Sequence, residues 1–366
     1  MAHGLHRRPC ESRVLATVAH RPGSFYRQPE AVGLHVATRF PSSAHAAVAL
    51  PLVTAFLNQK GGVGKTGVTV GAGGALAEMG RRVLMIDLDP QGHLTCEALR
   101  LPEADQDEPN LARALTGEYD GPIEHLIVAR PEYASGGRLD VIPTTLAMFL
   151  VVRDLYSRRA PETKLARLLE RLPTDAYDHV LIDCPPSLDI LTDTALVAAD
   201  GVVIPVQPSN TSLRALRLLI DQIATIENDL RLPRRELYGM VPGLYRRPLS
   251  GIQRFKMAEL ERYTLPDPQG LVDPLPILAH LPLATIVEEA WLSGEPVTDY
   301  RPTAPIADAY RKVAFRLDIA AGLSPMDAWM PEPFLEFDPD KPHFEELYLE
   351  DSAAEGAAVG AQAEGA

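Results

Sequence analysis

The sequence predicts an α/β fold in which helices cover both faces of a mainly parallel, twisted sheet. Short apolar runs alternate along the chain with longer helical patterns, and polar or glycine residues follow several of these runs. The chain has 366 residues, 46% of them hydrophobic, which is enough for a full-sized core. Ligands of such sheets bind at the carboxyl ends of the strands.

The expected strands are apolar runs with little polar alternation, as in strands that are buried on both faces. They lie at 52–58, 82–88, 139–143, 178–184, 201–206, 236–242 and 276–282. Helical patterns separate most of them and suit the connections of a parallel sheet. These patterns lie at 65–80, 145–156, 161–172, 189–199, 212–230, 250–262 and 305–320.

Both ends of the chain lack this periodicity. Residues 1–48 carry six arginines against two glutamates, and we expect a disordered basic arm. A transit peptide or a start codon assigned too far upstream would give the same composition. Residues 325–366 carry eleven acidic residues against one lysine and end in an Ala/Gly-rich stretch, which predicts a disordered acidic tail. The folded core is therefore expected to span 49–324.

Composition narrows the class of protein. No apolar run is long enough to predict a membrane-spanning helix, so we expect no membrane association. The three cysteines are scattered, which favours a reducing cytoplasm over a disulfide-built domain. The formal charge of −14 argues against nucleic-acid binding by the whole surface and requires a local basic patch for any such role.

The stretch NQKGGVGKT, which follows the first expected strand, is the strongest local signal. Its glycines allow backbone N–H groups to converge on phosphate oxygens just before a helix begins. Lys65 is placed to reach the β- and γ-phosphates of a nucleotide, and the Thr66 hydroxyl is placed to bind Mg²⁺. Gln59 stands where the usual phosphate-loop pattern has glycine, and Lys60 adds a second lysine, so the loop is a variant.

Carboxylates follow two further strands. Asp87 and Asp89 lie in LMIDLDPQG, and Asp183 lies in VLIDCPPS. Acids in such places hold magnesium or orient the attacking water of phosphoryl transfer. Singly they are more often helix caps or solvated loop residues, but beside a phosphate loop at least two of the three are expected in a nucleotide site.

Together KGGVGKT, LMIDLDPQG, LIDCPPS and HLPLATIVEEAWLSGEPV resemble the ParA family of deviant Walker ATPases, the partition proteins related to MinD, over residues 51–322. The resemblance implies a P-loop NTPase fold, ATP and Mg²⁺ as cofactors, and ATP hydrolysis. It places the nucleotide against Lys60, Gly61, Gly62, Val63, Gly64, Lys65, Thr66 and Gly67.

The resemblance also implies individual roles. Lys60 would be the signature lysine that crosses a homodimer interface to the partner's nucleotide, with Lys65 acting on its own nucleotide. Asp89 would position the hydrolytic water, and Asp87 and Asp183 would join Thr66 near the magnesium ion. Gly67 departs from the family, which usually has a hydroxyl residue there.

Family members bind DNA nonspecifically once ATP has made them dimerise. Here a basic cluster in the carboxyl-terminal half is the candidate DNA patch, and a solvated helix face is the competing interpretation. The cluster consists of Arg246, Arg247, Arg254 and Lys256. The resemblance further implies a ParB-like centromere-binding partner and location on the nucleoid.

Two other functions stay open. A MinD-like membrane switch needs a basic amphipathic carboxyl-terminal helix, which the acidic tail contradicts. A metabolic relative would use the same nucleotide dimer for electron transfer or for cofactor synthesis. The first version needs cluster-ligating cysteines, which Cys96 and Cys184 do not supply, and the second needs a substrate pocket.

Overall fold

The computed structural model describes residues 50–209, 212–265 and 273–328. The expected basic arm at 1–48 lies outside the described residues, as do residues 329–366 of the expected tail. Over the described residues, no helix is long and apolar enough to cross a membrane.

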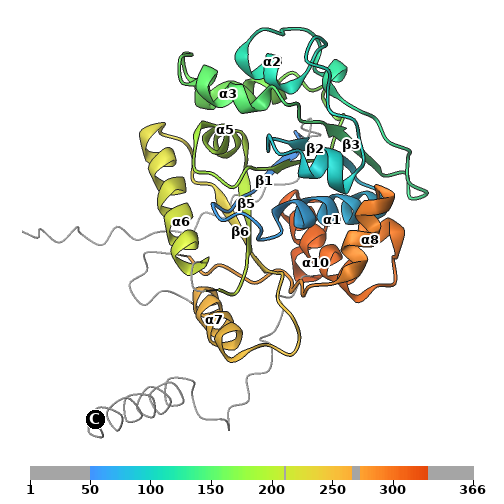
Figure 1. Cartoon of the computed structure of the whole chain (residues 1–366), viewed down its shortest axis with the longest axis vertical. Helices are drawn as coiled ribbons and strands as arrows, with labels where there is room; N and C mark the ends of the chain where they lie inside the picture. The colour runs from blue at the N-terminus through green and yellow to red at the C-terminus, as the bar shows by residue number, and fades with distance from the viewer. Residues whose placement is uncertain (1–49, 210–211, 266–272, 329–366) are drawn as a thin grey trace, which may run out of the picture. The chain divides into compact units, whose positions relative to one another are not determined.

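Six parallel strands form a single sheet, which confirms the predicted fold class (Figure 1). Their order across the sheet is β3-β2-β4-β1-β5-β6. Their bounds are β1 Leu52–Phe56, β2 Arg82–Asp87, β3 Arg138–Ile142, β4 His179–Asp183, β5 Gly201–Val206 and β6 Glu236–Pro242. All six are parallel, so their carboxyl ends share one edge. In register, Asp183 lies opposite both Phe56 of β1 and Asp87 of β2.

Helices cover both faces of this sheet. One face packs against α1 (Lys65–Glu78), α8 (Thr285–Ser293), α9 (Val297–Tyr300) and α10 (Pro305–Ala320), and Figure 1 shows α1 and α10 side by side. The other face packs against six helices. These are α2 (Leu111–Thr116), α3 (Met148–Leu155), α4 (Lys164–Leu169), α5 (Ile190–Ala198), α6 (Ser212–Asp229) and α7 (Gly251–Glu261).

Local signals explain several helix starts. Asp189 accepts a hydrogen bond from the Leu191 N–H at the start of α5, and Ser250 forms a capping box with Gln253 at the start of α7. Each helix predicted from periodicity has a counterpart. The sequence did not reveal α2, α8, α9 or the π-helical turn at His93–Ala98.

The prediction of a regular strand at 276–282 is wrong. This segment forms only isolated parallel bridges beside β6, from Met240 to Ile277 and from Gly243 to Leu281. The two bridges differ by one residue in register, and Pro242, which lies between them at the end of β6, has no N–H to donate, so no continuous ladder forms. The segment is nevertheless buried, which explains its apolar sequence.

Candidate functional site

The phosphate loop joins β1 to α1. Gly64 has φ 90°, in the left-handed region that favours glycine, and α1 begins at the next residue. No side chain caps this helix start. The first N–H groups of α1 are therefore free of side-chain caps and carry the positive end of the helix dipole, an arrangement that suits an anion.

Lys65 places a buried ammonium group beside this loop. Its side chain lines a cavity of about 370 Å³, while the residue as a whole is only 7% exposed. Among the described residues, the Lys65 ammonium has no hydrogen-bond or ion-pair partner. Burial lowers the pKa of Lys65, although the charges of Asp183 and Asp89 act in the opposite direction. A buried, unpaired cation of this kind fits an anionic ligand such as a phosphate.

Asp183 is held next to the loop by two hydroxyl groups. The Thr66 hydroxyl donates a hydrogen bond of 2.7 Å to Oδ2 of Asp183, and the Thr69 hydroxyl lies 3.3 Å from Oδ1. Burial raises the pKa of Asp183 to about 6, against the opposing effects of Thr66 and Lys65. Thr66 and Asp183 therefore lie side by side, and both groups have oxygens suited to Mg²⁺; their expected role as magnesium ligands stays a prediction.

Asp87 is turned toward its own loop. Its Oδ2 accepts hydrogen bonds from the N–H and hydroxyl of Thr95, at 2.9 and 2.6 Å, and its Oδ1 accepts one from the Asp89 N–H at 3.2 Å. Burial and the neighbouring Asp183 charge raise the pKa of Asp87 to about 8. These contacts make Asp87 an organiser of the segment that carries Asp89. Its expected place near magnesium stays a prediction.

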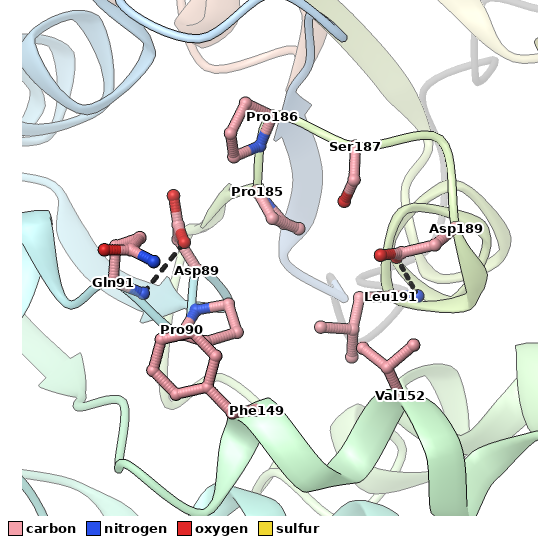
Figure 2. A pocket seen from close by; sticks show the side chains of 10 residues that line it. All are labelled: Asp89, Pro90, Gln91, Phe149, Val152, Pro185, Pro186, Ser187, Asp189 and Leu191. Atoms are coloured by element: carbon pink, nitrogen blue, oxygen red, sulfur yellow. Dashed lines mark hydrogen bonds between the residues drawn. The ribbon is translucent and has the colours of Figure 1, made fainter.

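Asp89 lies between two cavities. It lines the 370 Å³ cavity beside the phosphate loop and also a second one of about 230 Å³, and Gln91 and Pro186 are shared in the same way. Figure 2 shows the second cavity, with Phe149 and Val152 of α3 facing the proline segment that follows β4. Asp89 is only 5% exposed, and its Oδ1 accepts a hydrogen bond from the Gln91 N–H. Asp89 therefore borders both cavities, and its expected role in positioning a water stays a prediction.

Lys60 does not line the phosphate-loop cavity, and its ammonium group contacts the segment that follows β5. Its Nζ donates to Oε1 of Gln207 at 3.0 Å and to Oγ of Ser209 at 2.8 Å. Its backbone N–H donates to the Asn58 side chain at 2.9 Å. The two lysines of the loop thus have different surroundings in one subunit: Lys65 is buried and unpaired, while Lys60 is held by neutral acceptors of its own chain.

Sequence reasoning missed the apolar wall of the larger cavity. This wall comes from segments remote from the phosphate loop, after β6 and in α8 and α10. It includes Leu244, Leu281, Leu283, Val287, Trp291, Ile306 and Tyr310. The motif HLPLATIVEEAWLSGEPV covers part of this wall, so the resemblance pointed to the segment without assigning it a function.

The candidate DNA patch is only partly free. Arg246, Arg247 and Arg254 are exposed, and no ion pair of theirs occurs within the described ranges. Lys256 differs, since its Nζ forms a 2.6 Å ion pair with Glu259 and lies over the Phe255 ring. The three arginines are therefore the better candidates for contacts with phosphate.

Within residues 50–209, 212–265 and 273–328, no group of three or more His, Cys, Asp or Glu side chains is arranged to hold a metal ion. Magnesium in nucleotide sites is usually held by one or two protein oxygens together with the substrate's phosphates. The pair of Thr66 and Asp183 fits that pattern.

Comparison with known proteins agrees with this geometry. A family model described as an AAA domain matches residues 52–233. The sporulation initiation inhibitor protein Soj of Bacillus subtilis is 33% identical over 262 residues, which cover 72% of this chain and 96% of Soj. The chromosome partitioning protein ParA of Caulobacter vibrioides is 35% identical over 263 residues, which cover 72% of this chain and 92% of ParA.

The fold of this chain also resembles that of a solved structure. Cobyrinic acid a,c-diamide synthase from Mycobacterium smegmatis, with bound ATP analog and magnesium, has a TM-score of 0.59 and 29% sequence identity. The match covers 73% of this chain and 94% of the synthase.

Proposed function

The chain belongs to the ParA/MinD superfamily of P-loop ATPases, and we propose that it is a DNA-partition ATPase that dimerises on ATP. The observation that carries this proposal is the pair of inequivalent lysines: Lys65 lines the phosphate-loop cavity and the half-buried Lys60 does not, which suits a nucleotide shared by two subunits. The identity to Soj and to ParA over nearly their whole lengths supports the partition role.

ATP and Mg²⁺ are proposed to bind in the 370 Å³ cavity. The loop from Lys60 to Gly67 and the start of α1 would surround the phosphates, with Lys65 neutralising their charge. Thr66 and Asp183 would hold magnesium, which neutralises charge that builds up on the phosphates during transfer. The bound ATP analog and magnesium of the synthase support this assignment.

Hydrolysis would depend on Asp89, Asp87 and Lys60. Asp89 would orient the attacking water, and the Asp87 contact to its N–H would fix its position. Lys60 would leave Gln207 and Ser209 and reach the nucleotide of the partner subunit. An ammonium group binds a phosphate more strongly than it binds these side chains, because hydrogen bonds between two charged groups are stronger than hydrogen bonds to neutral oxygens.

The DNA role would follow dimerisation. Arg246, Arg247 and Arg254 would contact DNA phosphates without reading sequence, and a ParB-like partner bound at a centromere-like site would trigger hydrolysis and release. In this scheme the protein would act on the nucleoid.

Alanine variants of the two lysines test the proposal. Lys65→Ala removes the buried charge, so we expect fluorescent-ATP binding by the monomer to weaken strongly. Lys60→Ala removes a group that acts only across the interface, so we expect monomer binding to stay largely intact while ATP-dependent dimerisation, measured by light scattering, and hydrolysis both fall. The shared-site explanation fails if Lys60→Ala binds nucleotide as poorly as Lys65→Ala, or if it dimerises and hydrolyses like the unmodified chain.

The likeness to the synthase favours a second candidate, in which ATP drives a ligation in cofactor synthesis. Added DNA separates the two functions. A partition ATPase should bind DNA only with ATP, whereas a ligase should be indifferent to DNA and should need a small acid substrate for turnover.

A further inference from the structure

The first turns of α1 carry two glycines, Gly67 and Gly71, one turn apart on the helix. Tyr310 of α10 fills the space that they leave. A Cβ atom at position 71 would lie only 2.3 Å from Cδ1 of Tyr310, so the aromatic ring requires glycine there. A Cβ atom at position 67 would lie 3.7 Å from the Tyr310 hydroxyl, an ordinary contact distance. The ring thus lies along the helix with its hydroxyl at the phosphate-loop end.

The Tyr310 hydroxyl opens toward the larger cavity. Tyr310 is 3% exposed and lines that cavity together with the phosphate loop. Over the part of the chain that the structure describes, this hydroxyl has no hydrogen-bond partner. Burial raises the pKa of Tyr310, which keeps the phenol protonated and able to donate. Because Tyr310 borders the cavity, a ligand or water bound there can supply the missing partner.

We propose that the Tyr310 hydroxyl donates a hydrogen bond to a phosphate oxygen of the nucleotide beside Gly67, a position where α1 has no side chain of its own. This inference rests on the proposed function, because it assumes that a nucleotide occupies the cavity. Tyr310 of α10 thus supplies the hydrogen-bond donor that Gly67 of α1 lacks. The uncapped helix start, Lys65 and Thr66 all favour negative charge at this point. The hydroxyl would therefore donate to a charged phosphate oxygen, which makes a stronger hydrogen bond than a neutral acceptor does.

A purely structural role is the alternative explanation. Trp291 contacts the same space, with Cζ2 3.8 Å from a Cβ atom at position 67, so Tyr310 and Trp291 together fill the groove over the glycines. Packing alone would need only the ring, and phenylalanine would serve as well. The hydroxyl is therefore the group to test.

The test is calorimetric titration of the full chain with Mg²⁺ and a nonhydrolysable ATP analogue. Tyr310→Phe keeps the ring and removes only the hydroxyl, and we expect the Kd to rise about tenfold, which corresponds to about 1.4 kcal/mol. Adding Gly67→Ser to Tyr310→Phe places a hydroxyl on α1 at a position with room for it, and we expect most of the affinity to return.

Tyr238→Phe is the matched control. Tyr238 is a buried tyrosine of the same core cluster, but it does not line the cavity. Removing the Tyr238 hydroxyl should therefore leave the Kd unchanged. If the unmodified chain binds the analogue and Tyr310→Phe binds it equally well, the inference is refuted and the proposed function stands. If the unmodified chain does not bind the analogue, the proposed function is refuted together with the inference.

Discussion

Replacing Asp318 by asparagine should destabilise the protein by removing a buried charge near the end of α10. Asp318 receives two hydrogen bonds from the Arg81 guanidinium, at 2.7 and 2.9 Å, and it also contacts Ser324 and, at 3.4 Å, His179. The Asp318 side chain has no solvent exposure, while its partner Arg81 is 27% exposed. These contacts fix α10, the helix that carries Tyr310, against the start of β2.

The magnitude follows from the pKa of Asp318. Burial alone would raise this pKa, but the hydrogen bonds from His179, Arg81 and Ser324 outweigh burial and lower it from 3.8 to about 2. At about 1.36 kcal/mol per unit, the ionised form stabilises the fold by about 2.5 kcal/mol at neutral pH. Because the folded pKa is the lower one, this stability is present above pH 3.8 and is lost as the pH falls toward 2. About half of it should remain at about pH 3.

Urea unfolding of the two proteins at pH 7 and at pH 3 measures the effect. We expect Asp318→Asn to lower the free energy of unfolding by about 2 to 3 kcal/mol at pH 7, and by about half as much at pH 3. The matched control is Asp308→Asn on the same helix. Asp308 forms a 2.6 Å ion pair with Arg311, but its side chain is 69% exposed. That variant should cost at most about 0.5 kcal/mol. A loss at Asp318 no larger than at Asp308, or one independent of pH, would refute the reasoning.

Two further predictions concern function. Asp89→Asn should keep binding of the ATP analogue but lower phosphate release by at least about 10²-fold, because the group that orients the attacking water is lost; normal turnover in this variant would exclude Asp89 from that role. Changing Arg246 and Arg247 together to alanine should weaken ATP-dependent DNA binding and reduce the slope of log affinity against log salt by about 2. Alanine at the exposed pair Arg158 and Arg159 is the control, and equal losses from both pairs would remove the patch from consideration.

The sequence by itself determined the α/β class and the phosphate loop. Both are local properties: apolar runs predict buried strands, and a glycine-rich turn between strand and helix predicts convergent N–H groups. The resemblance placed Asp183 and Thr66 near one magnesium ion, and in the structure the Thr66 hydroxyl donates a hydrogen bond to Asp183. The sequence could not show that the seventh expected strand would pair with β6 only through isolated bridges, because that depends on the register between the two segments.

Only the tertiary structure decided how the individual side chains are used. Lys60 contacts Gln207 beyond β5, and nothing near Lys60 in the sequence predicts this partner. Tyr310 reaches Gly67 from α10, across more than two hundred residues of chain. Such contacts depend on how the helices pack over the sheet, and packing is set by the shapes of surfaces that are distant in sequence. Local patterns specify the elements and the backbone of the site, whereas long-range packing specifies which side chains complete it.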